Sequence, residues 1–236
     1  MPETTVVQIP IQMGPMLVNA YLLVGERVVA VDTGIPGKHD LVLDAVRAAG
    51  REPADVSLIL LTHGHADHAG SADALRRLTG AKIAIGVEDA DPASATAALR
   101  GRGFLGGLVV RMIQRRARAA VARADEPSGP EPDVLVSDEL DLTPYGVDAI
   151  AVPTLGHSPD SLTVFTAAGD AIVGDLIGGG GLSKRVPKRG LLYNDDDAMS
   201  ESIRAIIARS PRHVYDGHDA GPFTLAEMKA AFPELS

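Results

Sequence analysis

Short apolar runs dominate the first part of the chain and predict β-strands. Residues 5–9, 17–24 and 27–31 follow one another with brief turns between them, as expected for a β-meander. Residues 55–62 form a further run rich in Leu, Ile and Val, and residues 81–86 alternate between apolar and small or polar positions. The first half therefore supplies the strands of one candidate sheet.

Helical spacing appears between these strands. Residues 38–49 carry apolar side chains on one face and are followed by Gly50, a common helix end. Residues 69–80 have the same character and also end in a glycine. Strands that alternate with helices in this way predict an α/β fold.

The second half of the chain repeats this alternation. Strand-like runs are expected at 134–137, 148–152, 162–165, 171–174 and directly after His213. Helices are predicted at 198–208, where the acidic residues 195–197 would cap the first turn, and at 225–231. The repetition predicts two halves of similar construction.

Residues 88–135 interrupt the alternation of strands and helices. They are predicted to be a helical insertion within a single domain that spans residues 1–236. Apolar residues keep helical spacing from 104 to 124, and seven arginines without any acidic residue lie between 100 and 123. An acidic, proline-rich stretch at 126–133 is typical of a linker. We expect a helix packed on the domain with a solvated basic face. An active-site lid, a dimerisation helix and a helix lying on anionic lipid are the alternatives.

Composition narrows the class of protein. The chain has 236 residues, 45% hydrophobic and 3% aromatic, which suits a globular domain with an aliphatic core. The net charge of −9 argues against nucleic-acid binding. The absence of cysteine excludes disulfides and thiolate metal ligands. Residues 1–5 show no signal-peptide pattern, and no apolar run is long enough to span a bilayer, so we expect a cytoplasmic protein.

The strongest chemical signal is the stretch Thr62–His68, which holds three histidines and one aspartate between a predicted strand and a predicted helix. Folds of the α/β class place their sites on such loops. Neutral imidazole and carboxylate are preferred ligands of zinc and similar divalent metals. Residues two apart in an extended turn can point to the same side. His63 and His65 can therefore bind one ion, and Asp67 and His68 a second.

The second half places further candidate ligands at strand ends. His157 lies in a loop punctuated by glycine and proline, Asp175 directly follows a strand, and His218 lies beyond another. Asp32 ends a strand of the first half, where it is either a turn residue or a support for the metal loop. The remaining histidines, His39 and His213, are expected to lie outside the site.

The order of these residues resembles the metallo-β-lactamase superfamily. The pattern His63-x-His65-x-Asp67-His68 is followed by His157, Asp175 and His218. The flanking segments Asn19-Ala-Tyr-Leu-Leu, Val-Asp32-Thr-Gly and Gly-His157-Ser-Pro agree with the family pattern. The resemblance covers nearly the whole chain outside the insertion. It implies a four-layer αββα sandwich of two similar halves with two metals at one edge.

The resemblance also implies a ligand arrangement, in which Asp175 bridges two metals and Asp32 supports the metal loop. The first metal would take His63, His65 and His157, and the second Asp67, His68 and His218. Two divalent ions are expected, zinc in the first place, with iron or manganese as alternatives.

The function implied by this resemblance is that of a glyoxalase II-like or lactonase-like hydrolase. A metal-bridging hydroxide would cleave an ester, thioester or lactone-type bond. Asp67 would orient this hydroxide and move its proton, and Tyr193 would donate a hydrogen bond to the oxyanion. A small anionic substrate is favoured by the cationic loop that holds Lys184, Arg185, Lys188 and Arg189.

Other functions remain open at this point. A mononuclear iron dioxygenase that acts on persulfides has a similar sequence pattern. A phosphodiesterase or RNA-cleaving hydrolase would use the arginine-rich insertion to hold a phosphate backbone. A binding protein on a decayed enzyme scaffold is less compatible with a complete ligand set. The lack of cysteine argues against lactamases with a thiolate ligand, and the intact His65 and His68 argue against the flavodiiron branch. A homodimer is a possible oligomeric state.

Overall fold

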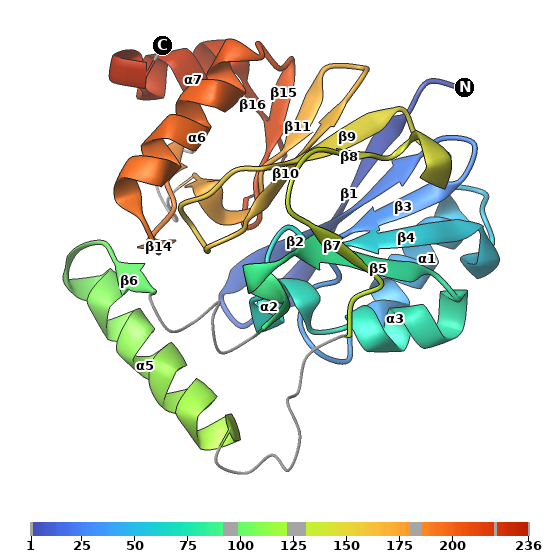
Figure 1. Cartoon of the computed structure of the whole chain (residues 1–236), viewed down its shortest axis with the longest axis horizontal. Helices are drawn as coiled ribbons and strands as arrows, with labels where there is room; N and C mark the ends of the chain where they lie inside the picture. Colours follow the sequence, from blue (N-terminus) through green and yellow to red (C-terminus); the bar gives the residue numbers. More distant parts are fainter. Residues whose placement is uncertain (1, 92–98, 122–130, 180–185, 220, 236) are drawn as a thin grey trace.

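Two six-stranded β-sheets stack face to face, and helices cover the outer face of each sheet (Figure 1). The computed structural model describes residues 2–91, 99–121, 131–179, 186–219 and 221–235. Each half of the chain contributes one sheet and the helices outside it, except that Val134–Val136, expected in the second half, forms an edge strand of the first sheet. The predicted four-layer αββα sandwich of two similar halves is confirmed.

The first sheet has the strand order β1-β2-β3-β4-β5-β7. Its strands are β1 (Thr5–Met13), β2 (Met16–Val24), β3 (Val28–Val31), β4 (Val56–Leu60), β5 (Lys82–Gly86) and β7 (Val134–Val136). The first three form the predicted antiparallel meander, and the last four run parallel. Parallel strands end at the same edge of a sheet, so the loop after β4 opens at that edge.

The second sheet has the strand order β16-β15-β11-β10-β9-β8. Its strands are β8 (Leu140–Asp141), β9 (Ala149–Pro153), β10 (Leu162–Thr166), β11 (Asp170–Ile172), β15 (His213–Tyr215) and β16 (Phe223–Thr224). Neither β8 nor β16 was predicted, because two residues are too few to show an alternating pattern. β9 and β11 both run antiparallel to β10, and β15 runs parallel to β11. The strands β9, β11 and β15 therefore run in the same direction.

Four main helices cover the outer faces of the sheets. α1 (His39–Ala48) and α3 (Ala72–Thr79) lie on the first sheet, and α6 (Asp196–Ala208) and α7 (Leu225–Ala231) lie on the second. The acidic cap predicted before α6 is Asp195, whose Oδ1 accepts from the backbone N–H of Asp197 at 2.9 Å and of Ala198 at 3.0 Å.

The single helix predicted over residues 69–80 is wrong in one respect. It begins at Ala72 instead of Ala69, as α3, and ends at Gly80 as predicted, while a separate helical turn, α2 (Ala66–Ala69), precedes it with Ser71 between the two. The Ser71 hydroxyl donates to the Ile35 carbonyl at 2.7 Å and accepts from the Lys38 N–H at 3.0 Å. Ser71 is thus bonded to the segment after β3, and α2, which carries two of the predicted ligands, is held as a separate turn.

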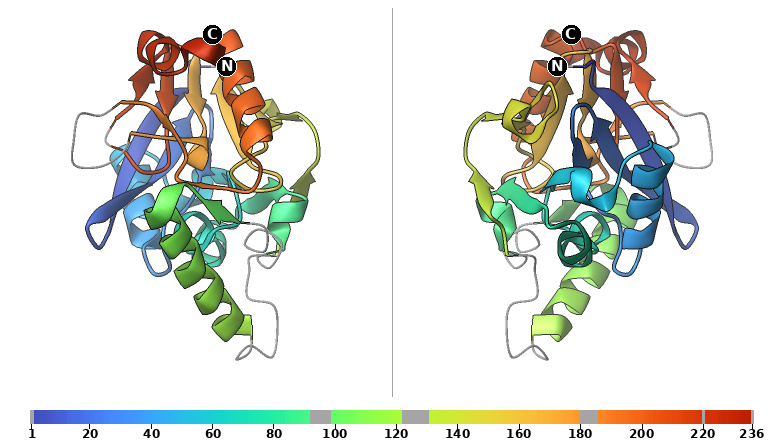
Figure 2. Two further views of the ribbon diagram at one scale, coloured as in Figure 1. Left: turned by 90° about the vertical axis from the view of Figure 1, so that its left-hand side faces the viewer. Right: turned by 90° about the vertical axis from the view of Figure 1, so that its right-hand side faces the viewer.

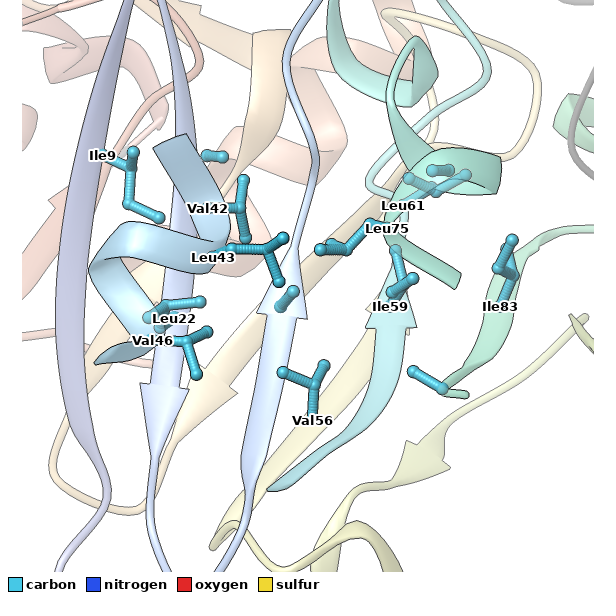
Figure 3. Close-up of a cluster of buried hydrophobic side chains, with 14 of the residues drawn as sticks. Ile9, Leu22, Val42, Leu43, Val46, Val56, Ile59, Leu61, Leu75 and Ile83 are labelled. Carbon is cyan, nitrogen blue, oxygen red and sulfur yellow. The ribbon is translucent and has the colours of Figure 1, made fainter. Parts of the chain in front are cut away.

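Hydrophobic side chains fill three layers between these elements. Val18, Ala20 and Leu22 of β2 point toward α1 and α3, whereas Tyr21 and Leu23 point between the sheets. Figure 3 shows the first of these layers, where side chains of α1 and α3 meet those of the strands. Burial on both faces explains why the strands are rich in apolar residues at consecutive positions.

The predicted insertion contains β6 (Arg100–Gly101) and α5 (Gly103–Val121), and α5 extends away from the two sheets (Figures 1 and 2). Gly106 and Val110 are buried, but Phe104 is 87% exposed and Leu108 and Met112 are also exposed. We expected this helix to be packed with a solvated basic face. Its outer face is instead apolar as well as basic. The expected linker at 126–133 lies mostly outside the described residues.

β6 pairs with β14 (Leu192–Tyr193), and β12 (Ile177–Gly178) pairs with β13 (Lys188–Arg189). These two small sheets attach the insertion and the glycine-rich segment to the second half of the molecule. None of the helices in the described ranges has the length and apolarity needed to cross a lipid bilayer.

Candidate metal centre

Four loops at the carboxyl ends of strands meet at one edge of the sandwich, between α2 and β14 (Figure 1). They follow β4, β9, β11 and β15. Together they carry all seven residues predicted as metal ligands, and the structure brings these side chains into contact with one another.

The imidazoles of His63, His65 and His157 form one group. Nε2 of His157 lies 3.1 Å from Nδ1 of His65, and one ring nitrogen of each residue falls within 4.8 Å of the others. Within the described part of the chain, Nε2 of His63 is buried without a hydrogen-bond partner. Three converging nitrogen atoms in a buried position match the donor set of a tetrahedral metal site.

Asp67, His68 and His218 form a second group with donor atoms within 4.8 Å of one another. Asp175 lies between the two groups. Its Oδ1 is 3.2 Å from His68 Nε2, and its Oδ2 is 3.0 Å from His218 Nε2 and 3.7 Å from His157 Nε2. A carboxylate in contact with both groups has the position that a bridging ligand requires.

Asp32 supports the loop after β4 from within the protein. Its Oδ1 accepts from the Thr62 N–H at 2.7 Å, and its Oδ2 accepts from the Thr62 hydroxyl at 2.8 Å. Nδ1 of His68 lies 2.8 Å from the same Oδ2. Asp32 takes a left-handed backbone conformation, with φ of 59°, which is uncommon for a residue other than glycine. These contacts favour a supporting role over that of a simple turn residue.

Backbone carbonyls orient two further imidazoles. Nδ1 of His157 lies 3.0 Å from the Leu192 carbonyl of β14, and Nδ1 of His218 lies 2.6 Å from the Leu17 carbonyl of β2. A carbonyl only accepts, so each Nδ1 carries a proton, and in the neutral form of each imidazole Nε2 presents a lone pair to the site. No sequence pattern marks these carbonyl groups, because every residue has one.

The loop that carries His218 is tied to β2 by polar side chains. Asn19 donates from Nδ2 to the carbonyls of Asp216 and Asp219, at 3.1 and 2.8 Å, and the Tyr21 hydroxyl donates to the Asp216 carbonyl at 2.5 Å. The signal available in the sequence was a polar Asn19 within an otherwise apolar strand.

Burial and neighbouring charges set the protonation of the site. Burial lowers the pKa of His63 well below its usual value and that of His157 to about 4. Burial opposes charge on His68 and His218 too, but Asp175 beside them raises the pKa of His68 well above its usual value and that of His218 to about 9. Burial also opposes the charge on Asp175, which His218 and His68 nevertheless hold at a pKa well below its usual range.

The donor set fits divalent metal ions. Nε2 of His63, Nε2 of His68 and Oδ1 of Asp175 are buried and, in the described ranges, form no hydrogen bond. Burying such groups without a hydrogen bond is costly, and divalent cations held by the two donor groups would satisfy all three. The residues present are therefore suited to hold metal, with imidazole and carboxylate in the proportions that zinc, iron and manganese accept.

The structure places the other predicted site residues in different environments. The ring of Tyr193 packs beneath the guanidinium of Arg102, with 4.6 Å from Cζ to the ring centroid, and against the core under α6. Nη2 of Arg189 lies 3.2 Å from Oε1 of Glu234. Lys188 is exposed, and Lys184 and Arg185 lie outside the described residues. His39 and His213 belong to neither of the two ligand groups, as expected.

A sequence model described as "Metallo-beta-lactamase superfamily" matches residues 13–213, which is most of the chain. The chain belongs to this superfamily. A probable metallo-hydrolase of Bacillus subtilis (strain 168), YqgX, is 26% identical over 216 residues, which cover 89% of this chain and 88% of that protein. The family membership confirms the predicted resemblance and the predicted enzyme class, a hydrolase of the metallo-β-lactamase fold.

Solved structures share the fold at lower identity. The BLEG-1 B3 metallo-β-lactamase matches with a TM-score of 0.69 and 22% identity, over 98% of this chain and 100% of that one. TTHA1623, solved in a di-iron-bound form, matches with a TM-score of 0.63 and 23% identity, over 94% and 96% of the two chains. Sequence identities of 22% and 23% show that the fold is shared, and they carry no information about the reaction.

Proposed function

We propose that this member of the superfamily is a dinuclear metal-dependent hydrolase that cleaves an ester, thioester or lactone-type bond. The observation that carries the proposal is the pair of three-residue donor groups in contact with one carboxylate, Asp175. One group draws on His63, His65 and His157, and the other on Asp67, His68 and His218. The di-iron form of the neighbour TTHA1623 supports two metals on this fold. Zinc is the first expectation, with iron or manganese as alternatives.

When bound, two divalent ions supply a water acidified toward neutral pH and a Lewis acid for the scissile carbonyl. The chain's own residues then position the reacting groups and transfer protons. Asp67 is partly exposed, with Oδ2 3.8 Å from His218 Nε2, and it can receive a proton from the nucleophile and pass it to the leaving group. Tyr193 is proposed as a hydrogen-bond donor to the oxyanion. Unchanged turnover of Tyr193→Phe would remove that role.

The deciding experiment is metal content per chain for protein purified without added metal, followed by turnover on an ester, thioester and lactone panel. About two zinc-type ions per chain with hydrolysis of one panel member are expected. His157→Ala and His218→Ala should each lower metal content, whereas His213→Ala, in a histidine outside both groups, should not. A single iron with oxygen consumption on a persulfide would replace the hydrolase with a dioxygenase.

The charge of the substrate can be tested at β13. Lys188 is exposed, whereas Arg189 forms an ion pair with Glu234 and lies near Asp196. If the substrate is anionic, Lys188→Glu should raise KM with little change in kcat. Lys82→Glu, an exposed lysine at the start of β5, is the control.

We propose a second copy of this chain as the partner of the exposed α5 face. Phe104, Leu108 and Met112 recur every fourth residue, with exposed Arg111 and Arg115 among them. Protein interfaces are enriched in aromatic residues, Met and Arg, and depleted in Lys, Glu and Asp. The seven arginines of residues 100–123 leave 15 basic against 31 acidic residues elsewhere, so a second copy offers the opposite charge.

The oligomeric state tests this partner. A molar mass that rises from monomer to dimer with protein concentration, and falls with added salt or with Leu108→Ser, is expected. A monomer at every concentration would contradict the dimer. Sedimentation of the monomer with anionic vesicles would assign the helix to a lipid surface instead.

A further inference from the structure

The turn that follows His157 is bound to the first half of the molecule. The residues after β5 form a short 3₁₀ turn, Glu88–Ala90, and this turn faces Ser158–Ser161. His157 is the one member of the three-histidine group that comes from the second half. The distance between His157 and the other two histidines therefore depends on how this turn is held.

Asp89 is the centre of the contact. Its Oδ2 accepts a hydrogen bond of 2.5 Å from the Ser158 hydroxyl, and the Ser158 hydroxyl lies 2.6 Å from that of Ser161. The Ser161 hydroxyl also accepts from the Ser158 N–H at 3.0 Å. Ser158 can thus donate to Asp89 while it accepts from Ser161, and the three polar side chains form one connected network.

A second bond crosses between the halves beside this network. The backbone N–H of Glu88 donates to Oδ2 of Asp160 at 2.7 Å. The two segments also approach closely at Gly86, where an added Cβ would lie 2.2 Å from the Asp160 carbonyl oxygen. The turn after His157 therefore has little room to shift relative to β5.

The cost of this arrangement indicates that it serves more than packing. Asp89 is 1% exposed, its Oδ1 has no hydrogen-bond partner among the described residues, and burial raises the pKa of its carboxyl to about 7. A buried carboxyl with one unpaired oxygen destabilises the fold. An apolar residue at this position would pack at lower cost but could not accept the Ser158 hydrogen bond.

We propose that Asp89 is a positioning residue that, through Ser158, holds the His157 loop at the distance from His63 and His65 at which these three histidines bind a metal ion. The proposal rests on the metal centre proposed above. Asp89 belongs to neither of the two donor groups. It acts by fixing the backbone of Ser158, while the Leu192 carbonyl fixes the ring of His157.

Zinc affinity, measured by competition with a chromophoric chelator, tests the proposal. Residues that support metal ligands typically contribute tenfold or more to affinity, so Asp89→Ala should weaken one zinc-binding step about tenfold. Asp89→Asn keeps an acceptor for Ser158 and should bind zinc like the wild type. Glu88→Ala, an exposed acid one residue earlier, is the control and should also bind like the wild type.

The same substitution in a His157→Ala background separates positioning from general stability. There, Asp89→Ala should have no further effect on zinc affinity, because the ligand it positions is gone. An equal loss in both backgrounds, or an unchanged affinity of Asp89→Ala in the wild-type background, would overturn the proposal. If Asp89→Ala does not fold, Ser158→Ala takes its place with the same expected results.

The two proposals fail in distinguishable ways. A wild-type chain that binds no zinc-type ion removes the metal centre and this inference with it. A wild-type chain that binds two ions, with Asp89→Ala equal to it, leaves the hydrolase proposal intact and refutes the role of Asp89 alone.

Discussion

Replacing Asp89 with asparagine is expected to change how the stability of the metal-free protein depends on pH. Burial raises the pKa of the Asp89 carboxyl from 3.8 to about 7, so the folded protein retains a proton there that the unfolded chain releases. Stability falls with rising pH wherever the folded state binds more protons. The contribution of Asp89 is therefore fully present below about pH 4 and is lost as pH rises to about 7. Asparagine has no such proton.

The size of the effect follows from the two pKa values. The full shift corresponds to about 4 kcal/mol, at about 1.4 kcal/mol per pKa unit. Between pH 5 and pH 8 the wild type should lose about 2.5 kcal/mol relative to Asp89→Asn, because part of the loss already occurs below pH 5. All other titrating groups are common to both proteins and cancel in the difference.

The assay is urea unfolding of chelator-treated wild type and variant at several pH values, followed by circular dichroism. Chelation is needed because bound cations would favour the ionised carboxylate. Glu201→Gln, at an exposed position of α6, is the control, and its curve should run parallel to that of the wild type. Parallel curves for Asp89→Asn and wild type would refute the reasoning, because Asp89 would then be ionised in the fold as in the unfolded chain.

Other predictions concern the site and its rim. Gly217→Ala should lower metal content, since its Cβ would lie 2.1 Å from Asp175 Oδ1; Gly107→Ala, with open space at the Cβ, should not. Removing metal with a chelator should lower the urea midpoint of the holoenzyme, because one site at a free metal concentration of a hundred times Kd contributes about 2.7 kcal/mol to the unfolding free energy; an unchanged midpoint would contradict bound metal. Arg102→Met should cost about 1 kcal/mol or less in unfolding free energy, because its bidentate pair with Asp196 is partly exposed; a loss of several kcal/mol would mean that the pair is coupled to the fold.

Much of the fold was predictable from local patterns. The meander of β1 to β3, the helices α1, α6 and α7 and most central strands were found because apolar periodicity reflects which side of an element is buried. The errors came from contacts outside the local segment. Ser71 separates α2 from α3 because it bonds to residues 35 and 38, so the predicted helix begins later than expected. β8 and β16 exist because neighbouring strands pair with them.

The candidate donor residues of the site were predictable, and so was one supporting residue, Asp32, but its other supports were not. His63, His65, Asp67 and His68 are recognisable because imidazole and carboxylate at short spacing have few other uses on a strand-to-helix loop. Asp89 showed no comparable signal, since its partner Ser158 is remote in the sequence and the bond forms only when the two halves meet.

The sequence by itself therefore determined the elements, the two-halved architecture and the chemical nature of the donor groups, because periodicity and side-chain chemistry are properties of the chain at each position. The tertiary structure decided which donors meet, which nitrogen of each imidazole faces the site and which groups are charged. Those properties depend on distances and burial that exist only after the two sheets have packed together.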